Sequence, residues 1–426
     1  MPSTGPDPAA PASGGGCAAR VPRRRAAVTT GLDQVARSGL PLPGRGRVAV
    51  LCNASTVSSR WTPTLDALIA LPGVHIERIF SPQHGFGLEK QDNMIESPDG
   101  VHPRHGLPII SLYAERREPQ PAHFDGIDAL IVDVPDVGTR VYTFLATALL
   151  AIRAAARAGV PTVILDRPNP IAGAIEGPIA ADAFLSFVGL IDVPLRHGLT
   201  AGELCMYGAV RLDVAGGKDT LSVVKANGWT RDRYHDETGL PWTPPSPNMP
   251  SLDTACVYPG QVVLEGTNLS EGRGTTRPFE LFGAPWLVPQ RVLAELEPER
   301  GLLAGALLRE VTFEPTFHKY AGQLVRGFQL HVLDRRAFRP VATTVTLLAA
   351  IRRAHGSDLA WKAPPYEYER DRLPVDLIFG TDRVRLALED GRSPREIVMS
   401  WTRPLAEYRE RIAPFLLYDP PPEVPA

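Results

Sequence analysis

The sequence contains the segments RVAVLCN (47–53), ALIVDVP (129–135) and TVILDRP (162–168). Each is a short, continuously apolar run that is rich in β-branched residues and ends in polar or proline positions. Such runs are typical of strands that are buried on both faces of a sheet. Two similar runs, IERIFSP (76–82) and PIISLY (108–113), complete the set of expected strands.

Helical patterns lie between these strands. The stretches 62–73 and 141–159 are helical, and the second is rich in Ala and Leu and ends at Gly159. A further helix is expected to begin at Thr200, because Thr200 and Glu203 have the spacing of a capping box. This alternation predicts an α/β fold with a doubly wound, mostly parallel sheet that has helices on both faces.

The order of the expected elements becomes less regular after about residue 240. Loops rich in Pro and Ser, such as PWTPPSPNMPSLD (241–253), are followed by shorter mixed segments. We therefore predict a main domain over residues 31–245 and a smaller auxiliary α+β domain over residues 246–426. Residues 1–30, which are rich in Pro, Gly and Ala, are predicted to form a disordered tail.

The composition excludes several classes of protein. The chain has 426 residues, with 45 basic and 47 acidic side chains and a formal net charge of −2. No strong field therefore selects nucleic acid or an anionic membrane, and neither is expected as a partner. The four cysteines lie far apart and form no zinc-like pattern with histidine, so we expect neither a disulfide framework nor a metal site.

The compartment is predicted from the N-terminal residues. Residues 1–16 contain no Leu, Ile, Val or Phe, so they lack the apolar segment of a secretory signal. No run reaches the roughly 18 apolar residues that a membrane span needs. We expect a cytoplasmic protein, with export as the alternative if the true start lies elsewhere.

Polar side chains gather where the expected strands end. In a doubly wound sheet, ligands bind outside the carboxyl ends of the strands. Asp and Asn also cap helices and form turns, so each residue alone has a structural interpretation. Their coincidence at several strand ends predicts a ligand pocket on that edge of the sheet. The residues are Asn53, Gln83, His84, Asp133, Asp136, Asp166, Arg167 and Asn169.

The sequence lacks the common nucleotide and serine-hydrolase motifs. It contains no G-x-G-x-x-G after the first strand, no G-x-x-x-x-G-K-[ST] and no G-x-S-x-G. Acids, Arg, Asn and Tyr instead recur in the loops DVGTRVY (136–142), RHG (196–198) and EGTNLSEGRG (265–274). Amides and acids pair with hydroxyls, and Arg binds a carboxylate with two hydrogen bonds. This inventory suits a polyol ligand that carries a carboxylate, and it supplies the acids that a glycosidase needs.

Several longer motifs occur together in one order. They are FSPQHGFG (80–87), DVPDVGTRVYTF (133–144), LDRPNPI (165–171), RHGLTAGEL (196–204), SPNMPSLDTACVYPG (246–260), EGTNLSEGRGTTRPFELFGAPW (265–286) and PTFHKYAGQLVRGFQLHV (315–332). With these motifs, the sequence from about residue 31 to residue 420 closely resembles the exo-acting β-N-acetylmuramidases, a glycoside hydrolase family formerly known as a domain of unknown function.

The resemblance implies a Rossmann-like domain and an auxiliary domain, with the active site in the cleft between them. The implied reaction is hydrolysis of a terminal, non-reducing β-linked N-acetylmuramic acid from peptidoglycan fragments, without a metal or nucleotide cofactor. This sugar carries a lactyl carboxylate, a 2-acetamido group and hydroxyls. Its site should therefore combine Arg, amide and acid side chains, as the residue inventory does.

One departure from the family concerns Gln83. The resemblance implies S-P-E-H-G, whereas residues 81–85 read S-P-Q-H-G. A Gln amide cannot replace a carboxylic acid as the proton donor to a leaving oxygen. If the family's Glu is the general acid, either this chain is slow or inactive or another acid acts. For the second case the resemblance favours Glu96, with Glu89 and Asp92 as alternatives in the same loop.

Three further residues are candidates for the catalytic machinery. Glu265 and Asp136 are the candidates for a second carboxylate, and a role of Glu265 in bracing its own loop is the alternative. The substrate's acetamido oxygen could instead act as the nucleophile, so that one acid and an orienting carboxylate suffice. His84 is expected to bond a hydroxyl or to tune a neighbouring acid, with a structural imidazole as the alternative.

Arginine, amide and hydroxyl side chains supply the candidate contacts to substrate. Arg140, Arg196 and Arg273 are candidates for the lactyl carboxylate, and a structural ion pair is the alternative for each. We expect about one of the three to touch the ligand. The other candidates are Asn53, Gln83, Tyr142, Asp166, Asn169, His197, Asn248, Asn268 and Ser270.

Two other functions compete with the hydrolase. The first is a binding protein for muramoyl sugars that has lost turnover because of Gln83. A large gain of hydrolysis in Gln83→Glu, at unchanged affinity, would identify that binder or an impaired enzyme. The second is a hydrolase with a different sugar preference, which a comparison of muramide and glucosaminide substrates would reveal.

Overall fold

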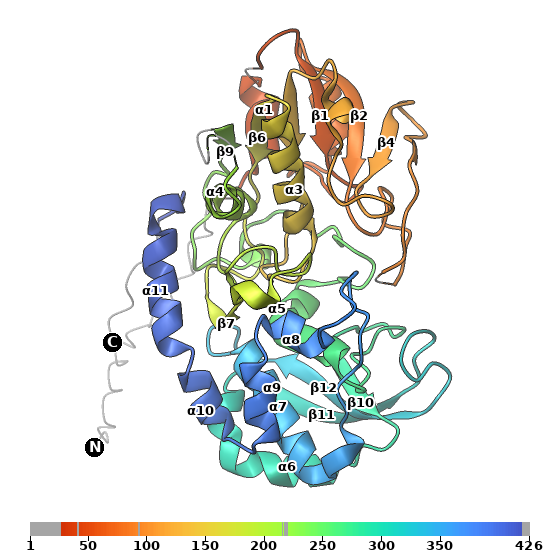
Figure 1. Ribbon diagram of the computed structural model, residues 1–426, viewed down its shortest axis with the longest axis vertical. Coiled ribbons are helices and arrows are strands. Elements are labelled where there is room, and N and C mark those ends of the chain that lie inside the picture. The colour runs from red at the N-terminus through yellow and green to blue at the C-terminus, as the bar shows by residue number, and fades with distance from the viewer. Residues whose placement is uncertain (1–26, 41, 93, 215, 217–219, 420–426) are drawn as a thin grey trace, which may run out of the picture.

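The computed structural model describes residues 27–40, 42–92, 94–214, 216 and 220–419. Figure 1 shows two parts, one above the other: the chain from red to green forms the upper part, and the chain from green to blue forms most of the lower part. The predicted tail lies outside the described residues except for positions 27–30. None of the described helices is long and apolar enough to cross a membrane.

The upper part is built on a seven-stranded sheet. In spatial order its strands are β3 (Gly100–Val101), β4 (Pro108–Ser111), β2 (His75–Ser81), β1 (Arg47–Leu51), β5 (Ala129–Val132), β6 (Thr162–Leu165) and β9 (Leu221–Val224). Neighbouring strands pair in parallel except for the antiparallel pair β3–β4. The predicted strands are confirmed, and β3 and β9 are additional.

Helices cover both faces of this sheet. They are α1 (Gly31–Ser38), α2 (Thr64–Ile69), α3 (Phe144–Arg157) and α4 (Ala201–Arg211). Val48 and Val50 of β1 share a buried cluster with α1 and α2, whereas Ala49 and Leu51 share another with α3 and α4. Alternate residues of a strand point to opposite faces, so this division confirms the predicted doubly wound α/β architecture.

Local sequence signals explain where these helices begin and end. Thr200 caps α4, because its hydroxyl accepts from the backbone N–H of Glu203 (3.3 Å) and the Glu203 carboxylate accepts from the backbone N–H of Thr200 (3.0 Å). The predicted capping box is therefore confirmed. Gly159 follows α3 with φ of 71°, a conformation that glycine adopts without strain.

The lower part contains a three-stranded antiparallel sheet and most of the helices of the second half of the chain. Its strands in spatial order are β10 (Leu281–Ala284), β12 (Val325–Val332) and β11 (Ala306–Phe313). The helices are α5 (Leu252–Gln261), α6 (Pro289–Leu296), α7 (Pro340–His355), α8 (Pro374–Phe379), α9 (Arg383–Glu389), α10 (Pro394–Met399) and α11 (Thr402–Ile412). This part is the smaller α+β unit that the sequence predicts. The predicted boundary at residues 245–246 falls in the irregular stretch between β9 and α5.

The end of the described chain returns to the upper part, where α11 lies beside the rest of the molecule in Figure 1. The Tyr408 hydroxyl donates to the carbonyl oxygen of His197 (3.1 Å). Beyond α11, the Tyr418 hydroxyl donates to Asp166 (2.6 Å). A short two-stranded sheet, β7 (Glu176–Ile179) with β8 (Pro194–Arg196), comes between β6 and β9 in the chain. These contacts tie the two parts together.

Candidate active site

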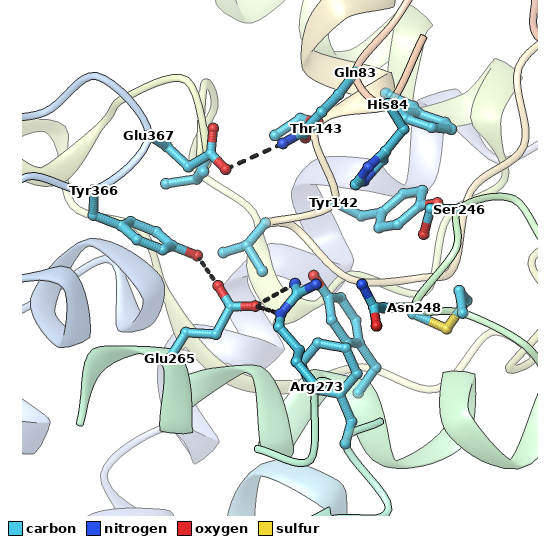
Figure 2. A pocket seen from close by; sticks show the side chains of 16 residues that line it. Gln83, His84, Tyr142, Thr143, Ser246, Asn248, Glu265, Arg273, Tyr366 and Glu367 are labelled. Atoms are coloured by element: carbon cyan, nitrogen blue, oxygen red, sulfur yellow. Dashed lines mark hydrogen bonds and ion pairs between the residues drawn. The ribbon is translucent and has the colours of Figure 1, made fainter. Parts of the chain in front are cut away.

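One pocket is lined by residues of both parts of the molecule and has a volume of ≈ 460 Å³ including its mouth. Figure 2 shows Gln83, His84 and Thr143 on one side of it, Glu265 and Arg273 on the opposite side, and Tyr366 and Glu367 between them. The polar lining residues are Gln83, His84, Tyr142, Thr143, Ser246, Asn248, Tyr258, Glu265, Arg273, Tyr366 and Glu367. This convergence of polar groups is typical of a small-molecule site.

The end of strand β2 positions Gln83 and His84. Gly85 follows with φ of 81°, and the ring nitrogen Nδ1 of His84 lies 2.8 Å from the carbonyl oxygen of Lys90. A carbonyl only accepts, so Nδ1 carries the proton and Nε2 is left as an acceptor. Burial lowers the pKa of His84 to about 4, and the ring is therefore neutral near pH 7.

Glu367 is the most deeply perturbed acid of the pocket, and only 5% of its surface is exposed. The Gln83 side-chain amide donates to its Oε1 (3.2 Å), and the Tyr113 hydroxyl donates to its Oε2 (2.6 Å). Burial and the nearby Glu265 carboxylate raise the pKa of Glu367 to about 7, although these two hydrogen bonds lower it. Near neutral pH this side chain is therefore a carboxylic acid for a substantial fraction of the time.

Glu265 lies in a different environment. It belongs to a 3₁₀ turn, Val262–Gly266, that follows α5. Its Oε1 accepts from Nε (3.2 Å) and Nη2 (2.7 Å) of Arg273, and its Oε2 accepts from the Tyr366 hydroxyl (2.7 Å). Glu265 and Arg273 thus form a buried ion pair with two charge-assisted hydrogen bonds.

Arg273 has one donor left over for a ligand. Its buried Nη1 group has no hydrogen-bond partner among the described residues. Behind it, Glu271 accepts from Lys319 Nζ (2.9 Å) and lies 3.5 Å from Arg273 Nε. This second acid adds a further negative charge beside the guanidinium of Arg273.

The backbone of the pocket is unusual at three positions. His84, Phe279 and Glu367 have φ of 75°, 63° and 44°, in the left-handed region that non-glycine residues rarely adopt. All three line the pocket. Each such conformation costs about 1–3 kcal/mol and clusters at functional sites, where surrounding structure maintains it. The strain is a second, independent indication of a site here.

The structure brings six of the predicted site residues together in this pocket: Gln83, His84, Tyr142, Asn248, Glu265 and Arg273. They come from four separate motifs of the sequence. The Asn248 amide donates to the carbonyl oxygen of Gln91 (2.5 Å), so the loop after β2 is tied to the start of the lower part.

The other predicted carboxylates lie outside the pocket lining. The Glu96 side chain is 54% exposed, and its nearest charged partner is Arg117 at 3.9 Å. Asp136 lies in a neighbouring cleft with Arg167. It accepts from His197 Nε2 (3.1 Å) and from the backbone N–H of Gly138 (2.7 Å), which fixes the turn after β5.

The other two predicted arginines bond to backbone carbonyls. Arg140 donates to the carbonyl oxygens of Pro178, Val193 and Ile378, and Arg196 donates to that of Ile171. Of the three, Arg273 is the one whose guanidinium lines the pocket.

The remaining predicted residues have structural partners. The Asp166 carboxylate accepts from the hydroxyls of Thr200 and Tyr418 and from the backbone N–H of Gly202. The Asn169 amide donates to the carbonyl oxygen of Leu199. The Asn268 side chain donates to the carbonyl oxygen of Asp358 and accepts from the backbone N–H of Ala360. Asn53 accepts from Ser55, and the Ser270 hydroxyl accepts from the N–H of Gly272.

Sequence reasoning missed Thr143, Ser246, Tyr258, Tyr366 and above all Glu367. Glu367 is 284 residues away from Gln83 along the chain, so no local spacing connects them. The only sequence signal is the segment PPYEYE (364–369), where acids alternate with tyrosines next to two prolines.

The chemistry of the pocket defines a class of protein. A buried carboxylic acid with a raised pKa and a second carboxylate in an ion pair are the two groups that glycosidic bond cleavage requires. With an Arg donor and a neutral imidazole acceptor beside them, the fold and the site are those of a glycoside hydrolase.

Comparison with known proteins identifies the family. Residues 48–253 match the family model described as exo-beta-N-acetylmuramidase NamZ, N-terminal, and residues 256–418 match its C-terminal counterpart. The chain is 35% identical over 397 residues to the peptidoglycan beta-N-acetylmuramidase NamZ of Bacillus subtilis (strain 168), covering 92% of this chain and 91% of the relative. The chain belongs to the exo-β-N-acetylmuramidase NamZ family, which confirms the resemblance noted in the sequence.

Two solved structures are also similar to this chain. Both are DUF1343 family proteins of Bacteroides fragilis NCTC 9343, each 27% identical and covering 93% of this chain and 100% of its own. Their TM-scores are 0.81 and 0.72. The predicted fold class is confirmed over nearly the whole chain.

Proposed function

We propose that this chain is an exo-acting glycosidase that hydrolyses the terminal, non-reducing β-linked N-acetylmuramic acid of peptidoglycan fragments. The pocket between the two parts of the molecule is the proposed active site. The observation that carries the proposal is the presence, in one pocket, of the protonatable Glu367 and the Glu265–Arg273 ion pair. The Bacillus relative, which is named a peptidoglycan β-N-acetylmuramidase, supports the choice of substrate.

The donors and acceptors of the pocket suit a muramoyl sugar. The Nη1 group of Arg273, which has no partner among the described residues, is a donor for the lactyl carboxylate. An N-acetylglucosamine residue lacks this carboxylate. The neutral ring of His84 is an acceptor for a sugar hydroxyl. Tyr142, Ser246 and Asn248 line the same pocket and are available to the acetamido group and the remaining hydroxyls.

The test is release of nitrophenol from 4-nitrophenyl β-N-acetylmuramide by the purified full-length chain, with the corresponding β-N-acetylglucosaminide as the matched control. Selective turnover of the muramide is expected. Turnover of the glucosaminide in preference would contradict the substrate assignment. Binding of N-acetylmuramic acid with no turnover of either glycoside would favour the muramoyl-sugar binding protein instead.

We further propose that the chain acts in the cytoplasm on imported muropeptides. Cell fractionation followed by immunoblotting of the full-length chain is the measurement, and recovery of the protein with the extracellular or envelope fraction would contradict the proposal.

A further inference from the structure

We propose that Glu367 is the general acid of the hydrolysis, and that Gln83 positions its carboxyl group. The inference rests on the proposed function, because it assigns a step of that reaction. The acid, Glu367, belongs to the lower part of the molecule. The residue that positions it, Gln83, lies in the loop after β2.

The partners of Glu367 leave its proton available. Its two oxygens accept from a neutral amide (Gln83, 3.2 Å) and a neutral phenol (Tyr113, 2.6 Å). Among the described residues, no Lys, Arg or His side chain forms an ion pair with it. A cationic partner would hold the carboxylate form, so a set of neutral partners is what a proton donor requires.

The titration range of Glu367 matches the task. Its burial to 5% exposure raises its pKa to about 7. A general acid is most effective when its pKa is near the working pH, because the proton is then both present and readily transferred. The Glu96 side chain, in contrast, is 54% exposed and lies outside the pocket lining.

Gln83 has a fixed orientation that serves Glu367. The Thr143 hydroxyl donates to the Gln83 side-chain oxygen (2.5 Å), which turns the amide NH₂ group towards Glu367. Figure 2 shows this contact between Gln83 and Glu367. The amide cannot itself give up a proton at this pH, so Gln83 is a positioning residue and the acid chemistry belongs to its neighbour.

The step balances without any further reactant except water. The Glu367 O–H bond breaks as its proton moves to the glycosidic oxygen, and the C1–O bond breaks with its electron pair passing to that oxygen. The leaving sugar departs as a neutral alcohol. The oxygen of a water molecule then bonds to C1 and displaces any group that became bonded to C1 in an intermediate. The proton that this water loses restores the Glu367 carboxylic acid.

Two leaving groups test this role in the variant Glu367→Gln. Nitrophenolate is a stable anion that leaves without a proton, whereas the alcohol of N-acetylmuramoyl-β-1,4-N-acetylglucosamine needs one. We expect kcat/KM for the disaccharide to fall by about 10²- to 10⁴-fold and kcat/KM for the nitrophenyl muramide to fall far less. The loss of rate at high pH that we expect for the wild type should also disappear in this variant.

Glu369→Gln is the matched control, because Glu369 lies in the same loop and pairs with Arg372 outside the pocket. It should leave both rates within about twofold of the wild type, as expected for a surface change. Loss of disaccharide hydrolysis in Glu96→Gln, together with an active Glu367→Gln variant, would overturn the assignment. A wild-type chain that cleaves neither muramide overturns the proposed function as well, so the two failures are distinguishable.

Gln83→Met gives a measurement that leaves Glu367 in place. It removes a donor that stabilises the carboxylate, so the pKa of Glu367 rises. The decline of kcat/KM at high pH should move upward by about half a unit to one unit. A variant that loses rate equally at every pH would show that Gln83 is merely structural and would contradict its positioning role.

Discussion

Glu265 and Glu367 are two buried carboxyl groups of the same pocket, at 3% and 5% exposure, and their surroundings differ in kind. Glu265 has a guanidinium partner in Arg273, whereas the partners of Glu367 are an amide and a phenol. Environment alone can separate the roles of two identical side chains. The residues that contact each carboxyl group therefore distinguish Glu265, which is held in an ion pair, from Glu367, which keeps a proton.

The two regions also differ in origin. Glu265 and its Arg273 come from one loop of the lower part, eight residues apart. Glu367 depends on contacts to Gln83 and Tyr113, both in the upper part. The Glu265 region is therefore a local unit, while the Glu367 region forms only when the two parts of the molecule are assembled.

The largest expected effect on stability is at Glu265. Glu265→Gln removes the charge that compensates buried Arg273, and breaking one side of a buried pair costs about 3–5 kcal/mol. Glu367→Gln, by contrast, replaces a largely protonated acid with a neutral amide near pH 6 and should cost about 1 kcal/mol or less. Urea unfolding at pH 6 measures both free energies.

Glu407→Gln provides the control for Glu265. Glu407 pairs with Arg403 on α11, where both side chains are more than half exposed. Such a pair contributes about 0–1 kcal/mol, so its loss should be small. If Glu265→Gln and Glu367→Gln lower the free energy of unfolding equally, the distinction between an acid held in an ion pair and an acid that keeps its proton is contradicted.

The fold was predictable because its signals are local. The strands β1, β5 and β6 are continuously apolar, and the burial of these four- and five-residue runs matches that pattern. Strand β9 (Leu221–Val224) escaped prediction because it is the half-exposed edge of the sheet and lacks a fully apolar run. Helix α1 begins with a Thr30–Asp33 capping box, which is a local signal of the same kind as the one at α4.

The site was predictable only in part, because its decisive contacts are tertiary. Gln83, His84, Glu265 and Arg273 lie in motifs, so the sequence indicated them. Sequence could not separate Arg273 from Arg140, since only the fold shows that backbone carbonyls surround Arg140. The roles of these residues stay predictions, and the experiments above test them.

The next effect in size is the pH dependence that Glu367 gives to stability. The unfolded side chain ionises near its usual pKa of about 4.5, whereas the folded one keeps its proton up to about pH 7. Between these values the native state binds more protons than the unfolded state, so the free energy of unfolding falls as pH rises. The Glu367→Gln variant lacks this pH-dependent contribution to the free energy of unfolding.

We therefore expect the variant to gain about 1–3 kcal/mol relative to the wild type between pH 5 and pH 8. Urea titrations of both proteins across this range give the difference. Taking the difference cancels other buried acids with raised pKa values, such as Asp166 and Glu176. If the difference in free energy of unfolding stays constant with pH, the pKa of Glu367 in the folded protein is close to its pKa in the unfolded chain. That result would contradict the contrast between Glu367 and Glu265.

The smallest effect that the comparison predicts is at Tyr113, the second donor to Glu367. Tyr113→Phe removes one hydrogen bond to the carboxyl group, which is worth about 1 kcal/mol of stability near pH 6. Because that bond stabilises the carboxylate, its loss raises the pKa of Glu367, and the decline of kcat/KM should move to higher pH without a large change at its maximum. Tyr366→Phe, which removes the corresponding phenol from Glu265, should leave the position of that decline unchanged. If both variants shift it equally, the two carboxyl groups titrate as one coupled pair, and the division of roles between them fails.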